Sequence, residues 1–405
     1  MLGAVTSRYA LDSIVGRGSS LAVFADYALL MTLGVLLALV APLGLPEVGN
    51  RIVADFVRSG NTASIRSYLR LSTFLAVALG FILAALTGLL TDALMDQPAS
   101  FAIALIVIVP SIAFLNARRA QSLQLGGGNP VLFAPALSTG GSAAALAAVS
   151  FTQDMSLIVV ALSVAVGNVV TALTVCRTHL QDSQDSGERA SLHEQFQWLR
   201  TGSSAVANAM GTVILTQGDI IVVGLFASAT ETGSYAAASR LALVVTLALG
   251  GLTPREAPIL GRLVAHQDFS GAWAHYRGAS RLSGATGAAI CVVLVFGGAH
   301  LLELFIPGSG MAHPWLAILA VGRLGSAVVG PAADLLIALD AQALAARSSW
   351  IGVVIAVLLM VLLGHALGPL GIAIGTTIGM LTRSLLHYVF ARNRCLNYRL
   401  AANPR

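Results

Sequence analysis

Long apolar runs constrain this sequence more than any other feature. A helix needs about 20 mostly apolar residues to cross the hydrocarbon core of a bilayer. Polar, Gly-rich or Pro-rich breaks leave eleven such runs, at 21–45, 69–91, 99–115, 131–151, 156–176, 203–227, 232–252, 282–305, 314–339, 349–367 and 369–391. Charged residues make up only 10% of the chain, against about 25% in soluble proteins. The sequence therefore predicts an all-α, polytopic membrane protein.

The basic residues are concentrated in every second connection between these apolar runs. All 23 are arginine, and the absence of lysine excludes a Walker A phosphate loop and a Schiff-base lysine. Eighteen arginines lie in alternate connections, whereas the five short links between them carry none. Because cytoplasmic loops of membrane proteins are enriched in basic residues, this pattern predicts a cytoplasmic C-terminus. The arginines lie singly between apolar runs, so no nucleic-acid partner is expected.

The segment before the first run is ambiguous. An odd number of spans places the N-terminus outside, and Arg8 and Asp12 interrupt a weakly apolar stretch that is neither a signal peptide nor a full span. One interpretation is a first helix that is truncated by a late start site. The alternative is a segment that lies on the membrane surface in a true eleven-span protein.

The chain also repeats itself. Residues 51–72 and 262–283 share ten identities in 22 positions at an offset of 211, including Arg66 with Arg277 and Arg70 with Arg281. Six runs separate the copies, so both halves enter the membrane in the same sense, an arrangement used by transporters. We therefore expect two parallel, pseudo-twofold-related bundles with 11 to 12 transmembrane helices. The expected divisions are an N-terminal bundle at 1–178, a cytoplasmic linker at 179–202, a C-terminal bundle at 203–391 and a cytoplasmic tail at 392–405.

No enzyme motif is present in the sequence. The nucleophile-elbow, dinucleotide-binding and zinc-protease patterns are all missing, and the short outer links leave no room for catalytic loops. Cys176, Cys291 and Cys395 lack the spacing of a disulfide framework or a zinc site. We expect no catalytic residue, metal or cofactor, which leaves transport as the function class.

Charged residues inside the spans are the candidate functional residues, because each is costly in the bilayer unless it meets a partner or water. At a rise of about 1.5 Å per residue, Asp219, Arg240 and Arg323 lie at one depth, roughly 12 to 13 Å from the outer helix ends. Arg383 lies nearer the cytoplasm, and Asp26 lies near the outer end of its span. We favour a structural ion pair between Asp219 and Arg240. Arg323 is then the best candidate for an anion contact, since a guanidinium can bind phosphate oxygens in two-pronged fashion.

Three glycines in the last run have the spacing of a packing motif. Gly371, Gly375 and Gly379 form a doubled G-x-x-x-G stripe. Small residues at this spacing let neighbouring helices approach closely. The stripe therefore predicts a close helix contact rather than a substrate groove.

Several short motifs resemble one known family. They are QGDIIVVG at 217–224, GSYAAASRL at 233–241 with Pro254 and Pro258 after it, Gly44-Leu45 followed by Arg51 and Ala54, and LGIA at 370–373. In their order and spacing they resemble helices of the polysaccharide flippases in the multidrug/oligosaccharidyl-lipid/polysaccharide exporter superfamily. The first two motifs are similar to the seventh and eighth helices of those proteins. The likeness extends over nearly the whole chain.

The resemblance implies twelve spans in two six-helix bundles and a location in the bacterial cytoplasmic (inner) membrane. It implies translocation of an undecaprenyl-pyrophosphate-linked oligosaccharide to the outer leaflet by alternating access, during cell-surface polysaccharide biosynthesis. Its partners would be this lipid-linked glycan, membrane lipid, glycosyltransferases and a polysaccharide polymerase. Arg323, Arg240 and Arg383 would contact the anionic head group. Asp219 would pair with Arg240 or respond to a coupling ion, a role for which Asp26 is the second candidate.

Two other functions remain open at this stage. A drug or small-molecule antiporter of the same superfamily would favour acidic and aromatic linings, whereas the spans here hold as many basic residues as carboxylates and few central aromatic residues. A non-transporting membrane scaffold for glycan assembly is the other alternative.

Overall fold

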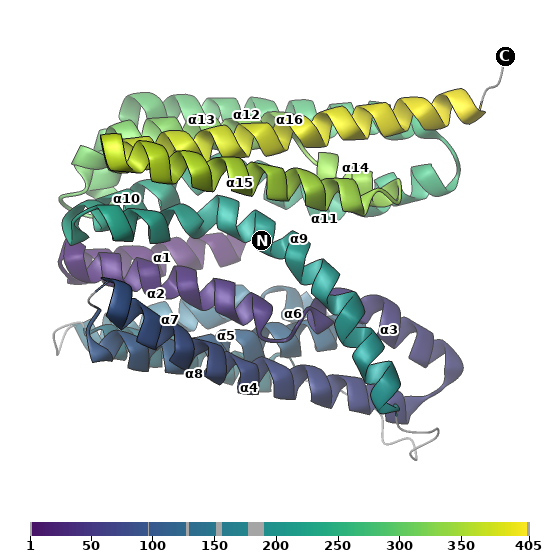
Figure 1. The fold of residues 1–405 in the computed structure, drawn as a ribbon, viewed down its shortest axis with the longest axis horizontal. Coiled ribbons are helices and arrows are strands. Elements are labelled where there is room, and N and C mark those ends of the chain that lie inside the picture. The colour runs from purple at the N-terminus through teal and green to yellow at the C-terminus, as the bar shows by residue number, and fades with distance from the viewer. Residues whose placement is uncertain (1, 96, 127–128, 151–155, 177–189, 403–405) are drawn as a thin grey trace. The chain divides into compact units, whose positions relative to one another are not determined.

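The computed structural model describes residues 2–95, 97–126, 129–150, 156–176 and 190–402, and every regular element within these ranges is a helix. The chain divides into two compact units, Met1–Met210 and Gly211–Arg405. The predicted all-α fold class is therefore confirmed. Each unit is built mainly from long helices (Figure 1).

Besides the beginning of α9 (Leu192–Phe226), the described residues of unit 1 form six long helices. These are α1 (Leu2–Gly18), α2 (Leu21–Val40), α4 (Thr62–Met95), α5 (Ala99–Gln124), α7 (Ala134–Ser150) and α8 (Leu157–Thr174). Two shorter helices, the amphipathic α3 (Leu45–Ser59) and α6 (Asn129–Leu132), lie between them. Ser20 and Ser156 cap α2 and α8, because each hydroxyl accepts a hydrogen bond from a backbone N–H in the first turn.

The described residues of unit 2 form the same number of main helical segments, but two of these segments are broken. Its elements are α9 (Leu192–Phe226, which begins in unit 1), α10 (Ala229–Ala242), the 3₁₀ turn η1 (Leu243–Thr246), α11 (Leu247–Ala265), α12 (Phe269–Phe305), the 3₁₀ turn η2 (Gly310–Ala312), α13 (His313–Val329), α14 (Ala332–Ala338), α15 (Gln342–Leu367) and α16 (Pro369–Ala402). The break between α13 and α14 falls at Gly330, which adopts a positive φ of 68°, and Pro331. Proline cannot continue the helical hydrogen-bond ladder, so the predicted span at 314–339 is interrupted there.

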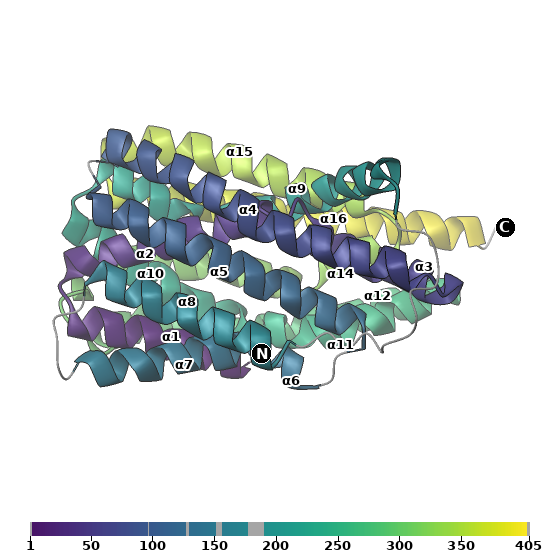
Figure 2. The ribbon, with the colours of Figure 1, turned by 90° about the horizontal axis from the view of Figure 1, so that it is seen from below.

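Within each unit, equivalent helices pack against one another in the same pattern, as expected for an internal repeat. In unit 1, α5 packs on α2, α4 and α8, and α7 packs on α8; in unit 2, α13 packs on α10, α12 and α16, and α15 packs on α16. The first helix follows the same scheme, since α1 packs on α7, and Gly211 of α9 lies against Ser349 of α15. Figure 2 gives a second view of these helices. The two halves of the chain therefore share one packing pattern.

The N-terminal segment is the first helix of this pattern. Ser7 Oγ lies 2.5 Å from Thr139 Oγ1 on α7, and Leu11 and Val15 are fully buried. The interpretation as a surface-lying segment is therefore wrong. With 17 residues, α1 is somewhat shorter than the length of about 20 that a full span requires.

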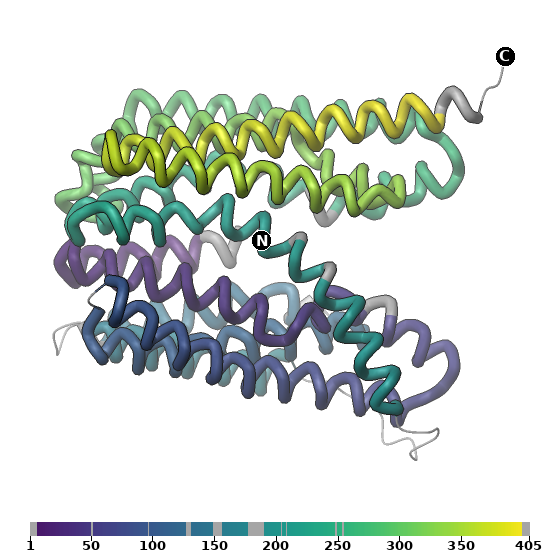
Figure 3. Tube along the Cα trace, viewed as in Figure 1, coloured from purple at the N-terminus to yellow at the C-terminus, as the bar shows by residue number. Residues whose placement is uncertain are grey.

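Most of the predicted spans correspond to helices. Among the described residues, nine helices are long and apolar enough to cross a membrane. The predicted run at 131–151 corresponds to α7, and the run at 232–252 is divided by η1. Of the predicted linker at 179–202, residues 179–189 lie outside the described residues, and residues from Leu192 onward form the first turns of α9 (Figure 3).

The sequence repeat and the structural repeat differ at one turn. Gly60 ends α3 in the left-handed conformation, with φ of 70°, whereas its sequence counterpart Gly271 lies inside the first turn of α12. The residues with equivalent roles are Asn61 and Asp268, whose side chains accept hydrogen bonds from the first turns of α4 and α12. The gapless match at the Ser-Gly dipeptide is therefore not a structural equivalence.

The glycine stripe of α16 makes the predicted close contact with α15. A Cβ atom added at Gly375 would lie 2.6 Å from the Met360 backbone nitrogen, and one at Gly379 would lie 2.7 Å from the Gly352 carbonyl oxygen. Both distances are too short for real side chains. The prediction of a helix contact is confirmed.

Candidate functional site

A buried carboxylate lies at the centre of the polar cluster in unit 2. Asp219 on α9 is 1% exposed, and its Oδ1 accepts a hydrogen bond of 3.0 Å from the Ile220 N–H. Its Oδ2 accepts hydrogen bonds from the Tyr235 hydroxyl at 3.1 Å and the Ser239 hydroxyl at 3.4 Å, both on α10. Charge-assisted hydrogen bonds of this kind are stronger than neutral ones, and they compensate for burial of the carboxylate.

Arg323 is the cation whose charge acts on Asp219. It lies on α13, is 3% exposed, and its Nη2 donates a hydrogen bond of 2.6 Å to the Thr216 carbonyl oxygen of α9. Besides donating this hydrogen bond, Arg323 attracts the Asp219 carboxylate electrostatically. Arg323 therefore joins α13 to residues 216–219 of α9.

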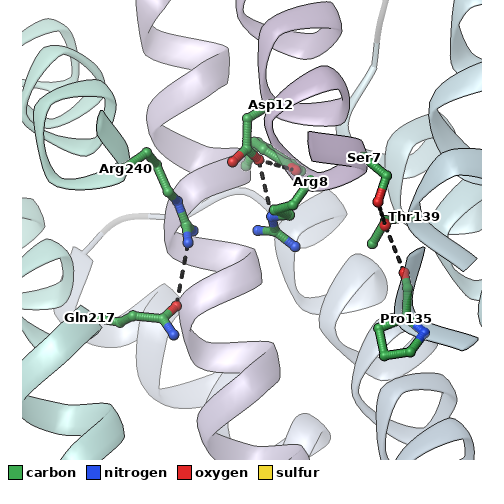
Figure 4. A network of polar contacts seen from close by, with 8 residues as sticks. Ser7, Arg8, Asp12, Pro135, Thr139, Gln217 and Arg240 are labelled. Atoms are coloured by element: carbon green, nitrogen blue, oxygen red, sulfur yellow. Dashed lines mark hydrogen bonds and ion pairs between the residues drawn. The ribbon is translucent and has the colours of Figure 1, made fainter. Parts of the chain in front are cut away.

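Arg240 reaches the same stretch of α9 from another direction. It lies on α10, is 6% exposed, and its Nη1 donates a hydrogen bond of 3.4 Å to Gln217 Oε1 (Figure 4). Ser239 precedes Arg240 in the sequence and contacts Asp219 instead. Successive helical residues point about 100° apart, which explains why the two neighbours meet different side chains.

Arg383 on α16 is the third arginine of this region. Its Nε is buried and has no hydrogen-bond partner among the described residues. Its charge and that of Arg323 repel each other. Two guanidinium groups held near each other in an apolar bundle favour the presence of an anion.

The structure brings together four of the five predicted site residues. Asp219, Arg240 and Arg323 contact or belong to residues 216–219 of α9, and Arg383 is linked to them through its electrostatic repulsion with Arg323. The predicted ion pair between Asp219 and Arg240 is wrong, because Arg240 donates to Gln217 and the cation that acts on Asp219 is Arg323. Asp26 is not in this cluster; it lies on α2 in unit 1 and is half-buried.

Two neutral side chains of the cluster are absent from the sequence-based set. Tyr235 is fully buried against Trp315, with ring centroids 6.0 Å apart, and Ser239 is 2% exposed. They are four residues apart on α10 and therefore lie on one helix face. Both residues fall within the GSYAAASRL motif. Two polar residues at i and i+4 in an otherwise small and apolar stretch could have identified them as members of the cluster.

Unit 1 holds a separate buried ion pair that the sequence analysis did not assign to a site. Arg8 Nε lies 3.3 Å from Asp12 Oδ1, which also accepts a hydrogen bond of 2.7 Å from the Tyr27 hydroxyl (Figure 4). Asp12 is 1% exposed. The spacing of Arg8 and Asp12, four residues apart on one helix, is the signal that could have predicted the pair.

Metal ligands are not grouped in the part of the chain that the structure describes. It contains no cluster of three or more His, Cys, Asp or Glu side chains that could hold a metal ion. Cys176, Cys291 and Cys395 are buried and are not joined in a disulfide.

Comparison of the sequence with protein-family models and with curated proteins gives no match. The fold is similar to that of a multidrug resistance MATE family transporter of the MOP superfamily in an inward-facing conformation, with a TM-score of 0.79 at 15% identity over 99% of this chain and 96% of that chain. It is also similar to the lipid II flippase MurJ in an inward closed conformation, with a TM-score of 0.74 at 14% identity over 98% of this chain and 88% of that chain.

A third similar structure is a MOP superfamily transporter from Pyrococcus furiosus Vc1, for which a binding pocket of reverse polarity suggests a different function. Its TM-score is 0.65 at 16% identity, over 98% of this chain and 96% of that chain. Together these likenesses show that the chain has the fold of MOP superfamily transporters.

Proposed function

We propose that this chain is an alternating-access transporter of the MOP superfamily that flips an undecaprenyl-pyrophosphate-linked oligosaccharide from the cytoplasmic to the outer leaflet. Proteins of this fold include a lipid II flippase, and the fold has been solved in inward-facing and outward-facing conformations. The proposal also draws on the sequence resemblance to polysaccharide flippases.

The observation that carries the proposal is the excess of arginine in the cluster of unit 2. Arg240 and Arg323 extend from two helices toward one stretch of α9 that bears a single carboxylate, Asp219, and the charge of Arg383 on a third helix acts on Arg323. Arginines at membrane depth mark substrate pathways, and a guanidinium binds phosphate oxygens through paired donors. A pyrophosphate head group has the charge and the geometry that such a cluster recognises.

The three arginines have different roles in this proposal. Arg323 is held by the Thr216 carbonyl and by the charge of Asp219, so it orients the cluster and adds positive potential. Arg383 has a buried Nε that no described residue binds, and it is the strongest candidate for direct contact with the anion. Arg240 contributes a second donor on the α10 side.

The proposed cellular setting follows from the sequence. The arginine distribution supports a cytoplasmic C-terminus, and the resemblance supports the bacterial inner membrane. Glycosyltransferases and a polysaccharide polymerase would then supply and consume the lipid-linked glycan on opposite sides of the membrane.

Flipping can be measured directly in vesicles. Purified protein is reconstituted with a fluorescent undecaprenyl-pyrophosphate oligosaccharide, and a membrane-impermeant quencher reports the fraction of lipid that changes leaflet. The Arg383→Ala variant should lose flipping by about tenfold or more, because a hydrogen bond to a charged group contributes about 1.5–3 kcal/mol.

The matched control is Arg392→Ala, which removes an exposed arginine from the same helix. It should flip at the wild-type rate. Wild-type flipping by Arg383→Ala, or no flipping by the wild-type protein, contradicts the proposal.

Drug export is the second candidate, because the similar structure with a TM-score of 0.79 is a multidrug transporter. The charge of the cluster favours lipid flipping over drug export, because the net positive charge of three arginines and one aspartate would repel a cationic drug. A vesicle uptake assay with a cationic dye decides between them: dye transport that survives Arg383→Ala, without lipid flipping, favours export.

A further inference from the structure

Each unit carries a groove lined by arginines, apart from the cluster described above. The first arginine groove has a volume of about 540 Å³ and lies between α4 and α5, where Arg66, Leu69, Arg70, Thr73, Phe74, Arg118 and Gln121 line it. The second arginine groove has a volume of about 570 Å³ and lies between α12, α13 and α16. Its α12 residues are Tyr276, Arg277, Ser280, Arg281, Gly284 and Ala285.

The two grooves are equivalent under the internal repeat. At the sequence offset of 211, the α4 lining residues correspond one by one to α12 lining residues: Arg66 to Arg277, Leu69 to Ser280, Arg70 to Arg281, Thr73 to Gly284 and Phe74 to Ala285. The offset comes from sequence identity and the grooves come from geometry, so the two observations are independent. In each groove two arginines are four residues apart on one helix and therefore lie on one face of it.

The arginines lie where the helices become apolar. Arg70 and Arg281 directly precede the leucines at which long apolar stretches begin. Next to them, Phe74 of the first groove is 67% exposed and Leu385 of the second is 61% exposed. A guanidinium pair beside exposed apolar side chains matches a phospholipid, with its phosphate on the arginines and its acyl chain along the apolar wall.

The inner walls of the grooves are fixed by hydrogen bonds between helices. Gln121 Nε2 donates to the Leu69 carbonyl and to Thr73 Oγ1, each at 2.9 Å. In the second groove the Tyr276 hydroxyl donates to the Val329 carbonyl at 2.8 Å, and the Ser280 hydroxyl donates to the same carbonyl at 2.6 Å. These hydrogen bonds fix α4 to α5 and α12 to α13 along the grooves.

The electrostatics of the grooves favours an anion. Among the described residues that line them, none is acidic, whereas the first contains three arginines and the second contains two. The exposed Arg70, Arg277 and Arg281 can reach a phosphate without disturbing the core. Basic pockets between transmembrane helices on the cytoplasmic side are suited to anionic lipid head groups, and the arginine distribution predicts that these ends face the cytoplasm.

We propose that each arginine groove binds the head group of one anionic phospholipid of the cytoplasmic leaflet, so that one molecule of this protein binds two such lipids at equivalent positions of its repeat. The inference is independent of the transported substrate. A free phosphate would share the guanidinium chemistry, but it would gain nothing from the apolar wall.

Native mass spectrometry of the full-length protein with added phosphatidylglycerol tests the inference. The wild type should retain two lipids, with weaker retention of phosphatidylcholine. The paired substitutions Arg66→Gln/Arg70→Gln and Arg277→Gln/Arg281→Gln should each remove one lipid, and the fourfold variant should remove both. Each loss should correspond to an affinity at least about tenfold lower, as expected for lost charged hydrogen bonds.

The matched control is Arg392→Gln/Arg394→Gln, which removes two exposed arginines of α16 and should leave both lipids bound. If a paired variant does not fold, the single variants Arg70→Gln and Arg281→Gln, which replace exposed side chains, take its place and should each weaken the binding of one lipid. Wild-type lipid retention by the fourfold variant overturns the inference. Equal binding of phosphatidylcholine, or displacement of phosphatidylglycerol by equimolar inorganic phosphate, also overturns it.

Discussion

The contact between Tyr235 and Asp219 allows a quantitative test of the buried cluster. In Tyr235→Phe the ring and its packing on Trp315 are retained, and only the hydroxyl is lost. A hydrogen bond to a charged group contributes about 1.5–3 kcal/mol, and the distance of 3.1 Å is long for an O–H donor, so we expect about 1.5 kcal/mol. For a domain of about this size the melting temperature should then fall by about 3–6 °C.

Thermal melting of the purified full-length protein measures this effect in two backgrounds. The Asp219→Asn substitution removes the charge and keeps an acceptor, so Tyr235→Phe should cost roughly half as much there, in the range of neutral hydrogen bonds of about 0.5–1.5 kcal/mol. The control is Tyr276→Phe, whose hydroxyl donates to the neutral Val329 carbonyl. Its cost should be equal in both backgrounds. An equal cost of Tyr235→Phe in both backgrounds would refute an ionised Asp219 that Tyr235 stabilises.

Two further predictions concern packing and charge. Gly375→Ala should destabilise the protein by about 1–3 kcal/mol, because its Cβ would lie 2.6 Å from the Met360 nitrogen, whereas Gly297→Ala, with open space around it, should be tolerated; melting temperatures separate the two. Arg8→Ala should cost about 3 kcal/mol by removing a partner of the buried Asp12, whereas Arg58→Ala, in an exposed pair with Asp55, should cost less than about 0.5 kcal/mol. Equal melting temperatures within either pair of variants would contradict the corresponding argument.

The helices and their repeat could be predicted from the sequence because the bilayer imposes a length and a composition on each span. The breaks inside spans were harder to predict. Gly330 and Pro331 interrupt one run and η1 interrupts another, although both stretches remain apolar throughout. An apolar composition predicts that a segment lies within the membrane, but it does not predict whether the helix in that segment is continuous.

The sequence pointed to the charged residues of the cluster in unit 2, but it did not predict their pairings or the neutral partners Tyr235 and Ser239. Depth along the helices placed Asp219, Arg240 and Arg323 at one level, and in the structure the two arginines contact Gln217 and Thr216, close to Asp219. Which side chains meet also depends on the rotation of each helix about its axis. One residue along α10 turns the chain by about 100°, and this rotation directs Ser239 to Asp219 and Arg240 to Gln217.

The N-terminal helix is a second case in which the residues were evident from the sequence but their pairing was not. Arg8 and Asp12 argued against a span when they were counted as separate charges. In the structure they neutralise each other on one face of α1, together with Tyr27 of α2. A paired charge costs far less in an apolar environment than two isolated charges, so pairing at i, i+4 has to be considered before a helix is excluded.

The most direct test of the account is the affinity of the purified protein for undecaprenyl pyrophosphate, measured by equilibrium titration in detergent beside the uncharged undecaprenol. We predict that the pyrophosphate lipid binds more tightly than the alcohol, and that Arg383→Gln weakens its binding by about 10- to 100-fold with no change for the alcohol. Equal affinity of the wild type for both lipids, or full affinity of Arg383→Gln for the pyrophosphate, would contradict a cationic head-group site in unit 2.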